Sequence, residues 1–150
     1  MSPTGPTRAR SALVVGAAQG IGLATAQRLV REGQQVTATW NTRPPPEEET
    51  SIAWRRCDIT DDASVQAVFD EAAERQRPFD VVVANAALVR DRMSSRMTEA
   101  DFRAVIDVNL VGSFRVARAA LGAMVRNRWG RMVFIGSVGG AYGLAAQSSY

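Results

Sequence analysis

The sequence contains no histidine and no lysine, and its only cysteine is Cys57. All 18 of its basic residues are therefore arginines. The lack of histidine argues against a His-based catalytic triad and against a metal cluster, so we expect no metal site. A single cysteine cannot form an internal disulfide, which fits a protein of the reducing cytoplasm. We expect Cys57 to be a small buried apolar residue.

The sequence also lacks any apolar run that approaches the ~20 residues needed for a membrane span, and we expect no membrane-spanning segment. Its first ten residues have no apolar stretch ahead of Arg8 and Arg10, so we interpret residues 1–10 as a flexible arm and not as a secretory signal. The net charge is +3, but the arginines are scattered among 15 acidic residues. Nucleic-acid binding needs a concentrated basic face, and we therefore expect no nucleic-acid partner.

What the sequence does have is a regular alternation of strand and helix patterns, in a chain that is 46% hydrophobic and 22% charged. Short apolar runs predict strands at 12–16, 36–40, 52–57, 81–84 and 131–136. Helical periodicity fills the intervals at 21–32, after a cap at Asp61, from 98–100 onward, and in a further stretch to about 126. The stretch 41–49 holds three prolines and predicts an exposed loop.

This alternation predicts right-handed βαβ units and an α/β fold: a doubly wound, three-layer parallel sheet of the Rossmann type. We expect residues 11–150 to form the N-terminal part of a single domain of this type. We expect Ile21, Ala24 and Leu29 to face the sheet from the first helix. In the third, Phe102, Val105, Ile106 and Leu110 fall on one face. The fifth strand would leave one edge unpaired, and we therefore expect the fold to be truncated after that strand.

A glycine turn lies between the first strand and the first helix, with Gly16, Gly20 and Gly22 in a G-x-x-x-G-x-G spacing. Glycine permits a tight turn of positive φ and lets the backbone approach a pyrophosphate, while the free N–H groups of the helix start favour the anion. The alternative is a turn whose glycines serve packing alone. We favour a dinucleotide site.

The end of the second strand bears on the choice of dinucleotide. NAD-binding chains carry an acid about twenty residues after the glycines, whereas this chain has no acid between Thr39 and Glu47. A 2′-phosphate would meet no repulsion and could reach Arg43, which favours NADPH over NADH. Asp58 and Asn85 follow the third and fourth strands, at the carboxyl ends where such sheets bind ligands. Capping of their own loops explains these two residues equally well.

Ser137 follows the fifth strand, and Tyr150 lies thirteen residues further on. A glycine turn followed by a serine and a tyrosine outlines a hydride-transfer site, in which hydroxyl donors stabilise the negative charge that develops on a carbonyl oxygen. A free tyrosine has a pKa of about 10 and needs a nearby cation to act near neutrality. Taken alone, Ser137 could instead end a strand, and Tyr150 could be an ordinary aromatic residue.

Taken together, these motifs resemble those of the short-chain dehydrogenase/reductase family, and most closely its beta-ketoacyl-[acyl carrier protein] reductases. The resemblance runs from Ser11 to Tyr150. It rests on the glycine turn and on five further segments: Asp58-Ile59-Thr60, Asn85-Ala86-Ala87, Asn109-Leu110-Val111-Gly112, Arg128 to Ser137, and Gln147-Ser148-Ser149-Tyr150.

The resemblance implies a role for each of these positions. Asp58 would contact adenine, Asn85 would support the ribose, and Asn109 would kink its helix and hold a water of the proton relay. Ser137 and Tyr150 would act on the substrate carbonyl. The implied cofactor contacts are Gly16, Gln19, Gly20, Ile21, Gly22, Asn41, Arg43, Asp58, Ile59, Asn85, Ala86 and Ala87; the implied substrate contacts are Ser137, Gln147 and Tyr150.

The resemblance further implies an NADPH-dependent reduction of a 3-oxoacyl thioester in fatty-acid biosynthesis, carried by acyl carrier protein or CoA, in a homotetramer. Arg128 matches a residue that docks the carrier protein, although a solvated face explains it more simply. Two other functions stay open: a family member acting on another carbonyl or alcohol, and a non-catalytic nucleotide-binding fragment.

Four departures from the family pattern bear on these expectations. Val15 replaces a threonine, Ala87 replaces a glycine, and Gln19 replaces an arginine frequent in NADPH-dependent members. The family's lysine would stand four residues after Tyr150, so we expect these 150 residues alone to be inactive.

Overall fold

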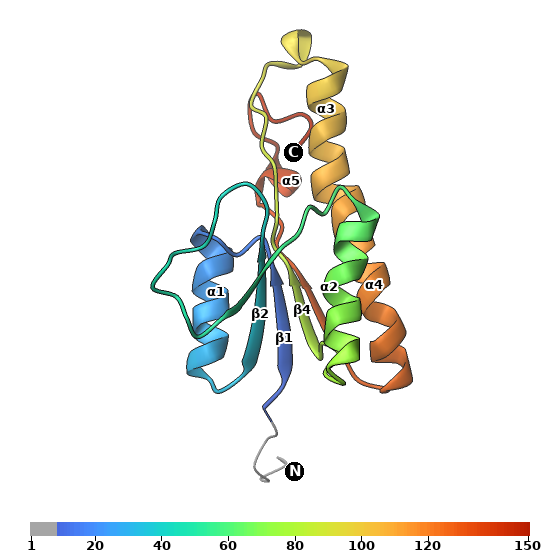
Figure 1. Cartoon of the computed structure of the whole chain (residues 1–150). Coiled ribbons are helices and arrows are strands. Elements are labelled where there is room, and N and C mark those ends of the chain that lie inside the picture. Colours follow the sequence, from blue (N-terminus) through green and yellow to red (C-terminus); the bar gives the residue numbers. More distant parts are fainter. Residues whose placement is uncertain (1–8) are drawn as a thin grey trace, which may run out of the picture.

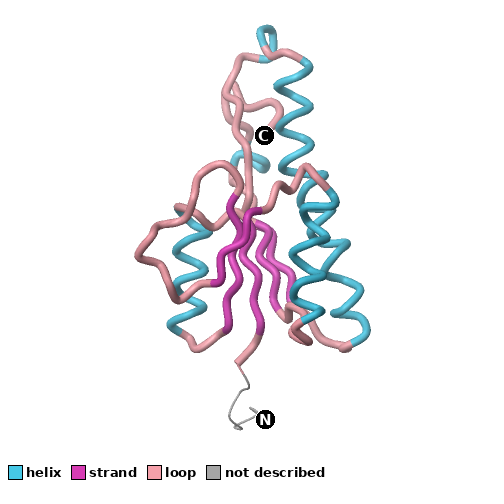
Figure 2. The backbone as a smooth tube through the Cα atoms, in the orientation of Figure 1, coloured by secondary structure: helices cyan, strands magenta, loops and turns pink. Residues whose placement is uncertain are grey.

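The computed structural model describes residues 9–150, so most of the expected arm at 1–10 lies outside the described residues. A five-stranded parallel sheet forms the centre, in the order β3-β2-β1-β4-β5 (Figure 2). Its strands are β1 (Ser11–Val15), β2 (Gln35–Trp40), β3 (Ala53–Arg56), β4 (Val81–Ala84) and β5 (Arg131–Phe134). The strand order reverses direction at β1, as in a doubly wound fold, which confirms the predicted fold class.

Helices cover both faces of this sheet. Helix α1 (Gly20–Arg31) lies on one face, and α2 (Asp62–Glu74) and α4 (Ser113–Arg126) lie on the other (Figure 1). Between β4 and α4 come a 3₁₀ turn η1 (Ser94–Arg96), α3 (Glu99–Ile106) and a π-helical segment η2 (Asp107–Gly112). A short helix α5 (Gly139–Tyr142) follows β5. Both α3 and the chain after β5 rise beyond the carboxyl end of the sheet.

The helix boundaries follow the signals expected of them. The Asp61 side chain accepts a hydrogen bond from the Ala63 amide at 3.0 Å and caps α2, as predicted. The Thr98 hydroxyl accepts one from the Asp101 amide at 3.1 Å at the start of α3. Gly33 ends the first helix with φ of +79°. The predicted loop at 41–49 contains no strand or helix.

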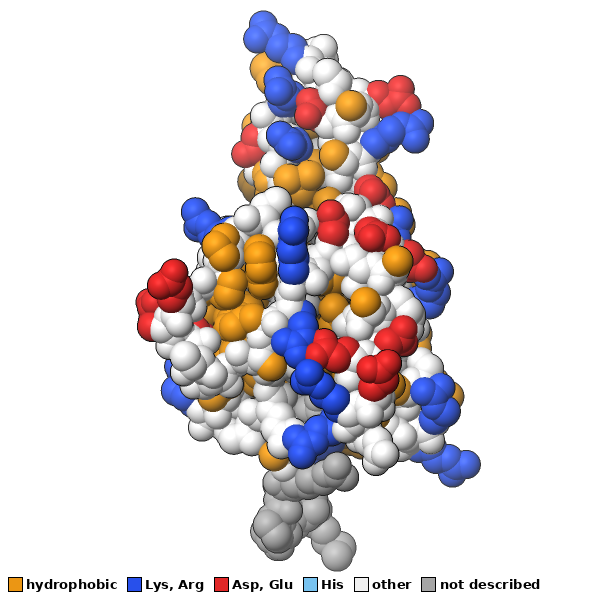
Figure 3. Space-filling model, in the orientation of Figure 1, with side chains coloured by type: hydrophobic (Ala, Val, Ile, Leu, Met, Phe, Trp, Pro, Cys, Tyr) orange, Lys and Arg blue, Asp and Glu red, His pale blue; other side chains and the backbone are white. Residues whose placement is uncertain are grey.

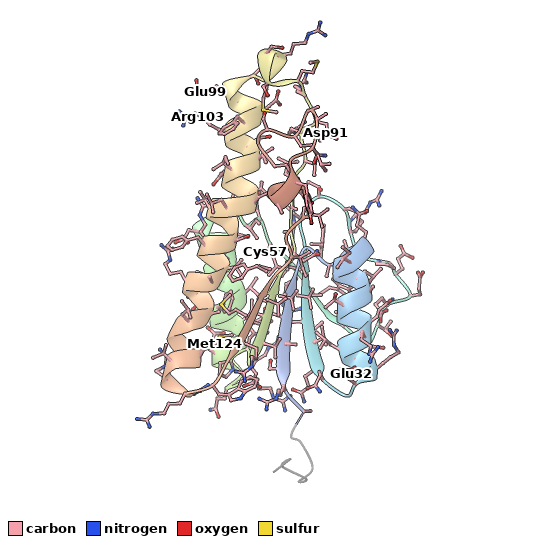
Figure 4. All side chains as sticks on the ribbon, turned by 180° about the vertical axis from the view of Figure 1, so that it is seen from behind. Glu32, Cys57, Asp91, Glu99, Arg103 and Met124 are labelled. Atoms are coloured by element: carbon pink, nitrogen blue, oxygen red, sulfur yellow. The ribbon has the colours of Figure 1, made fainter. Side chains whose placement is uncertain are left out.

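Two apolar cores lie on opposite faces of the sheet, because alternate residues of a strand point to opposite sides. Leu13 and Val15 of β1 face the α2/α4 side, where they join Val65, Val116 and Met124. On the α1 side, Ala12 and Val14 join a second cluster whose other members are Ala17, Ala26, Val36, Ala38, Ile52 and Val83. Met124 is labelled near the end of α4 in Figure 4, on the side of the larger core. Cys57 is buried in that core, as expected.

Two predicted helix faces were wrong. Ile21 and Ala24 of α1 are exposed, and the helix instead buries Gly22 and Ala26. Small residues on this face let α1 approach the sheet closely, so its larger residues turn outward or pack at the rim, as Leu29 does. In the third helix Val105 is buried, but Phe102 and Leu110 are exposed. This helix extends past the sheet, and the wider turns of η2 shift its apolar face out of register.

Helices α3 and α4, joined by η2, form one continuous helix over Glu99–Arg126. It is the one helix within residues 9–150 whose length and composition would suffice to cross a membrane, and 22% of its most apolar window is buried. Its Val116, Ala120 and Met124 pack against the sheet, however, so this helix is a layer of the α/β fold. Core helices of such folds meet the same criterion of length and composition.

Strand β5 is shorter than predicted, ending at Phe134, and it pairs with β4 on one side only. Val133 and Phe134 are exposed along it. The predicted edge in this apolar strand is therefore present in the described part of the chain.

The two sides of α4 provide a matched test of the core. Val116 is 1% exposed and Val125 is 71% exposed. We expect Val116→Ala to lower the free energy of unfolding by about 1.5–3 kcal/mol, because it removes buried methyl groups and leaves a cavity. We expect Val125→Ala to change it by less than about 0.5 kcal/mol. Urea unfolding of the full-length protein measures both, and equal losses would contradict this packing of α4.

Candidate active site

The turn after β1 is held by its neighbours on both sides. Gly16 has φ of +73°, and a Cβ there would lie 2.6 Å from the Ala86 Cα, so the chain leaves no room for a side chain. The Gly16 carbonyl accepts a hydrogen bond from Asn85 Nδ2 at 2.8 Å. A Cβ on Gly22 would meet the same Asn85 amide at 2.5 Å. Gly16 and Gly22 therefore serve packing, and Asn85 joins the end of β4 to the turn.

Gly20 differs from the other two glycines, because a Cβ built on it would have no atom within 4 Å. It has φ of +58° and begins α1 beside the exposed Ile21. The N-cap residue Gln19 makes no capping hydrogen bond, and no acidic residue lies in the first turn of the helix. The helix start thus presents free N–H groups and a positive dipole end to open space, which suits an anion.

Thr39 is a site residue that the sequence analysis missed. This buried side chain of β2 accepts a hydrogen bond from the Gly16 amide at 3.2 Å, while the Thr39 carbonyl accepts one from the Ala17 amide at 2.8 Å. Val15, which departs from the family pattern, is itself buried. A threonine within the apolar strand pattern 36–40 was the signal for this contact.

Arg43 and Gln19, which are 24 residues apart, meet at the mouth of the turn, where the guanidinium donates to Gln19 Oε1. The glutamine that replaces a family arginine therefore holds an arginine supplied by the loop after β2. Asn41, from the same loop, contributes to lowering the pKa of the Asp58 carboxylate. The structure brings together all four of these predicted cofactor residues at the carboxyl ends of β1, β2 and β3.

The Asp58 carboxylate is fixed mainly by Thr60, a second residue that sequence reasoning did not single out. Asp58 Oδ1 accepts from the Thr60 hydroxyl at 2.7 Å and from the Thr60 amide at 2.9 Å. These hydrogen bonds, and then those from Asn41 and the charge of Arg56, hold the pKa of Asp58 below its usual value. Ile59, in contrast, is buried with its side chain against Gly112.

Asn109 lies inside the π-helical segment η2, where the expected kink occurs as a change of helix type. Its side-chain amide pairs with the backbone of Leu88: Oδ1 accepts from the Leu88 amide at 2.8 Å, and Nδ2 donates to the Leu88 carbonyl at 2.9 Å. The Ser113 hydroxyl donates to the Asn109 carbonyl at 2.7 Å. Asn109 therefore fixes the path of the chain just after Ala86 and Ala87.

Ser137 is exposed beyond the carboxyl end of β5, and its hydroxyl accepts a hydrogen bond from the Gly139 amide at 3.0 Å. A Cβ on Gly139 would lie 3.2 Å from Ser137 Oγ and 3.6 Å from Gln147 Oε1, so these two polar atoms flank one glycine. Gln147 Oε1 is buried and has no hydrogen-bond partner among the described residues. Ser137 and Gln147 are thus brought together.

Tyr150 is 38% exposed, and its amide donates to the Gln147 carbonyl at 3.1 Å. No hydrogen bond joins Tyr150 to Ser137 within residues 9–150. The segment that carries Tyr150 packs on the loop after β4. The Arg92 amide donates to the Ala146 carbonyl at 2.8 Å, and the backbones of Arg92 and Gln147 form an isolated parallel β-bridge. The pair predicted for catalysis therefore shares one end of the sheet, with no hydrogen bond between the two residues.

Arg128 does not lie at this end. It precedes β5, whereas Ser137 follows it, so the two residues stand at opposite ends of the sheet. Trp129, next to Arg128, makes cation–π contacts with two arginines. The Arg10 guanidinium lies 3.6 Å from the centroid of its ring, and the Arg131 guanidinium lies 5.1 Å from it. Across residues 9–150 no group of three or more histidine, cysteine or acidic side chains is placed to hold a metal ion.

Comparison with known proteins decides what kind of site this is. The family model described as short chain dehydrogenase matches residues 10–150. The chain belongs to the short chain dehydrogenase family. Among curated relatives, it is 44% identical over 145 residues to the 3-oxoacyl-[acyl-carrier-protein] reductase MabA of Mycobacterium tuberculosis, a match covering 97% of this chain and 58% of the relative.

Two further relatives of this short chain dehydrogenase bear the same functional name. MabA of Mycobacterium avium is 42% identical over 141 residues, which cover 94% of this chain and 54% of the relative. FabG of Escherichia coli is 32% identical over 144 residues, covering 93% of this chain and 59% of the relative. The chain thus spans little more than half the length of the curated relatives it matches.

A nicotinamide dinucleotide fits the site of this short chain dehydrogenase. Gly20 leaves room for a diphosphate at the uncapped, acid-free start of α1. The loop after β2 adds Arg43 at the place where an adenosine ribose would lie. The residues that would hold the dinucleotide come from the carboxyl ends of four neighbouring strands.

Gly22 tests the architecture of the turn. We expect Gly22→Ala to weaken the binding of a nicotinamide dinucleotide, NADPH or NADH, at least about tenfold, because the added methyl would displace Asn85 and the Gly16 carbonyl. Gly122→Ala is the control: this exposed glycine within α4 has only a flexible arginine end within reach, at 3.5 Å. The control should keep its NADPH affinity and gain up to about 1 kcal/mol of stability. Calorimetric titration and thermal melting measure the two effects; an unchanged Gly22→Ala affinity would refute the packing role.

Asp58 generates a prediction about pH. Because its folded pKa is lowered, its contribution to stability is present at neutral pH and is lost as pH falls below about 4, through the folded value. We expect Thr60→Val to raise the pKa of Asp58 by removing the hydroxyl donor, whereas Thr42→Val in the exposed loop should leave it unchanged. Carboxyl ¹³C NMR titration follows both, and no difference between the variants would disprove the assigned hydrogen bond.

Proposed function

We propose that this chain carries the cofactor-binding part, with the serine and tyrosine, of an NADPH-dependent reductase that converts a 3-oxoacyl thioester into a 3-hydroxyacyl thioester in fatty-acid biosynthesis. One observation carries the proposal. The open, uncapped start of α1 and the Ser137–Gln147 pair lie at the same carboxyl end of one parallel sheet. The functional name shared by the mycobacterial and enteric relatives supports the choice of substrate.

The preference for NADPH is supported by charge at the end of β2. Arg43 is anchored there by Gln19, and no acid stands between Thr39 and Glu47 to accept a ribose hydroxyl. A doubly charged 2′-phosphate gains from this arrangement, while NADH gains little. When bound, the cofactor supplies the hydride for the reduction.

The chemistry proposed for the chain's own residues concerns the carbonyl oxygen. Ser137 would donate a hydrogen bond to it, and Tyr150 would donate the proton that neutralises the developing alkoxide. Gln147, whose buried Oε1 lacks a partner, would take up a substrate donor or orient Ser137. Asn109 would hold the proton relay in place, because its side chain is fixed by two hydrogen bonds to the Leu88 backbone. None of the 150 residues is a lysine, so within them the cation that the role of Tyr150 requires would have to be an arginine.

An acidic carrier protein or a CoA thioester would present the acyl group. The amino end of the sheet, where Arg128 stands beside the Arg10–Trp129–Arg131 stack, is basic and aromatic, as a surface for an acidic partner would be. We retain Arg128 as a docking residue. Its position implies that a carrier protein bound there sits away from Ser137 of the same chain.

We further propose a homotetramer assembled through the outer side of the Glu99–Arg126 helix. The large side chains exposed along this helix would be covered in such an assembly: Phe102, Leu110, Phe114, Leu121 and Val125. We also propose a cytoplasmic location, which the free, buried Cys57 supports.

Two other functions are distinguished by the same assay. A family member acting on a different carbonyl or alcohol would bind NADPH and turn over a different substrate. A non-catalytic nucleotide-binding module would bind NADPH and turn over nothing, which the missing lysine motivates.

The test is NADPH oxidation by the full-length protein with acetoacetyl-CoA. We expect turnover that falls about 100-fold or more in Ser137→Ala and in Tyr150→Phe, since each variant removes a donor to the carbonyl oxygen. Tyr142→Phe is the control, because this tyrosine lies in the same segment and is 87% exposed. No turnover with any 3-oxoacyl thioester would reject the proposed substrate class.

A further inference from the structure

The carboxyl ends of β2 and β3 carry a second guanidinium that the proposed function leaves unused. The two strands pair in register at their last residues, Trp40 and Arg56, so both side chains project from the same face of the sheet. That face is the one covered by α1, because Trp54, two residues earlier on β3, packs with the cluster that contains Ala26. Arg56 therefore lies on the side of the sheet where α1 begins.

The charge of Arg56 is available for an external partner. Its guanidinium lies over the Trp40 ring, 5.8 Å from the centroid, a contact that orients the cation without neutralising it. Arg56 is exposed and forms no ion pair with any carboxylate in residues 9–150. Asp58 lies two residues further on and its pKa is lowered by the charge of Arg56, but its Oδ1 accepts from Thr60 and it forms no ion pair with Arg56.

The preceding residue shows the contrast. Arg55 points to the opposite face, where its guanidinium donates to both carboxylate oxygens of Glu71 on α2. The pair is half-buried, and it raises the pKa of Arg55 while lowering that of Glu71. Arg55 is thus committed to holding β3 on α2, whereas Arg56 forms no ion pair and acts on Asp58 only through its charge, which lowers the pKa of that carboxyl. The two neighbours differ in environment but not in charge.

Arg43 and Arg56 both lie near the carboxyl end of β2, one on the loop that follows it and the other beside its last residue. Arg43 is fixed at the glycine turn by Gln19, and Arg56 is fixed at β3 by Trp40, the last residue of β2. An anion bound at the end of β2 would have Arg43 on the loop that follows this strand and Arg56 on the neighbouring strand. A phosphate monoester can accept several charge-assisted hydrogen bonds from such a pair, and a ribose hydroxyl cannot.

We propose that Arg56 is a specificity-determining residue, which binds the 2′-phosphate of NADPH together with Arg43. This inference rests on the proposed function, because it places the adenosine end of a nicotinamide dinucleotide at the end of β2. Arg56 takes the charge of the family arginine that Gln19 replaces, and it reaches the phosphate from β3 instead of from the glycine turn.

The experiment compares the dissociation constants of NADPH and NADH for the full-length protein and three variants, by calorimetric titration. We expect Arg56→Gln to weaken NADPH binding about tenfold and NADH binding less than about twofold, because only NADPH carries the phosphate. Arg56→Lys should recover part of the NADPH affinity by restoring the charge. Arg55→Gln removes the same charge one residue away on the opposite face and should leave the NADPH to NADH ratio unchanged. Thermal melting checks that each variant is folded.

The outcomes separate this inference from the proposed function. Equal weakening of NADPH and NADH in Arg56→Gln, or an unchanged ratio of the two constants, would overturn the role of Arg56. If the unsubstituted protein prefers NADPH and reduces acetoacetyl-CoA while Arg56→Gln keeps its preference, only the inference fails. If the unsubstituted protein binds neither dinucleotide, both fail.

Discussion

Three hydrogen bonds around the first glycine turn are the constraint on which the rest of the site depends. Thr39 holds the turn from β2 through the Gly16 and Ala17 amides, and Asn85 holds it from the end of β4 through the Gly16 carbonyl. The turn is therefore shaped by the two strands that flank β1. Because these bonds occupy the packed side of the turn, Gly20 and the start of α1 are left open on the other side.

The end of the sheet that would bind substrate is built differently. Asn109 ties η2 to Leu88, and the chain from Ser137 to Tyr150 lies against the loop after β4 through backbone bonds from Arg92. Few apolar side chains are buried in this region. Its helix α3, which carries Glu99 and Arg103 in Figure 4, projects away from the sheet. In the space-filling view, this projection is a narrower part that rises from the main body (Figure 3). With little burial, such a region opens locally at lower cost than the core does.

Most of the fold could be predicted because its signals are local. The Asp61 and Thr98 caps, the Gly33 stop and the apolar runs of the strands each act within a few residues. Prediction failed where a distant surface decided burial. Ile21 and Phe102 have the spacing of core residues, yet α1 buries small residues against the sheet and α3 extends beyond it. Thr39 and Thr60 were overlooked as site residues because their partners were not known from spacing.

By itself, the sequence determined which chemistry is available: glycines for a phosphate turn, a serine and a tyrosine for a carbonyl, arginines and no lysine for charge. It also determined the order of strands and helices, because hydrophobic period is a property of neighbouring residues. Tertiary structure alone decided that Gly16 and Gly22 pack while Gly20 stays open, and that Gln19 receives Arg43. It also decided the partners of Arg55 and Arg56, which the alternation of a strand places on opposite faces. Such pairings join residues that are far apart in the chain, so they form only when the strands, helices and loops pack together.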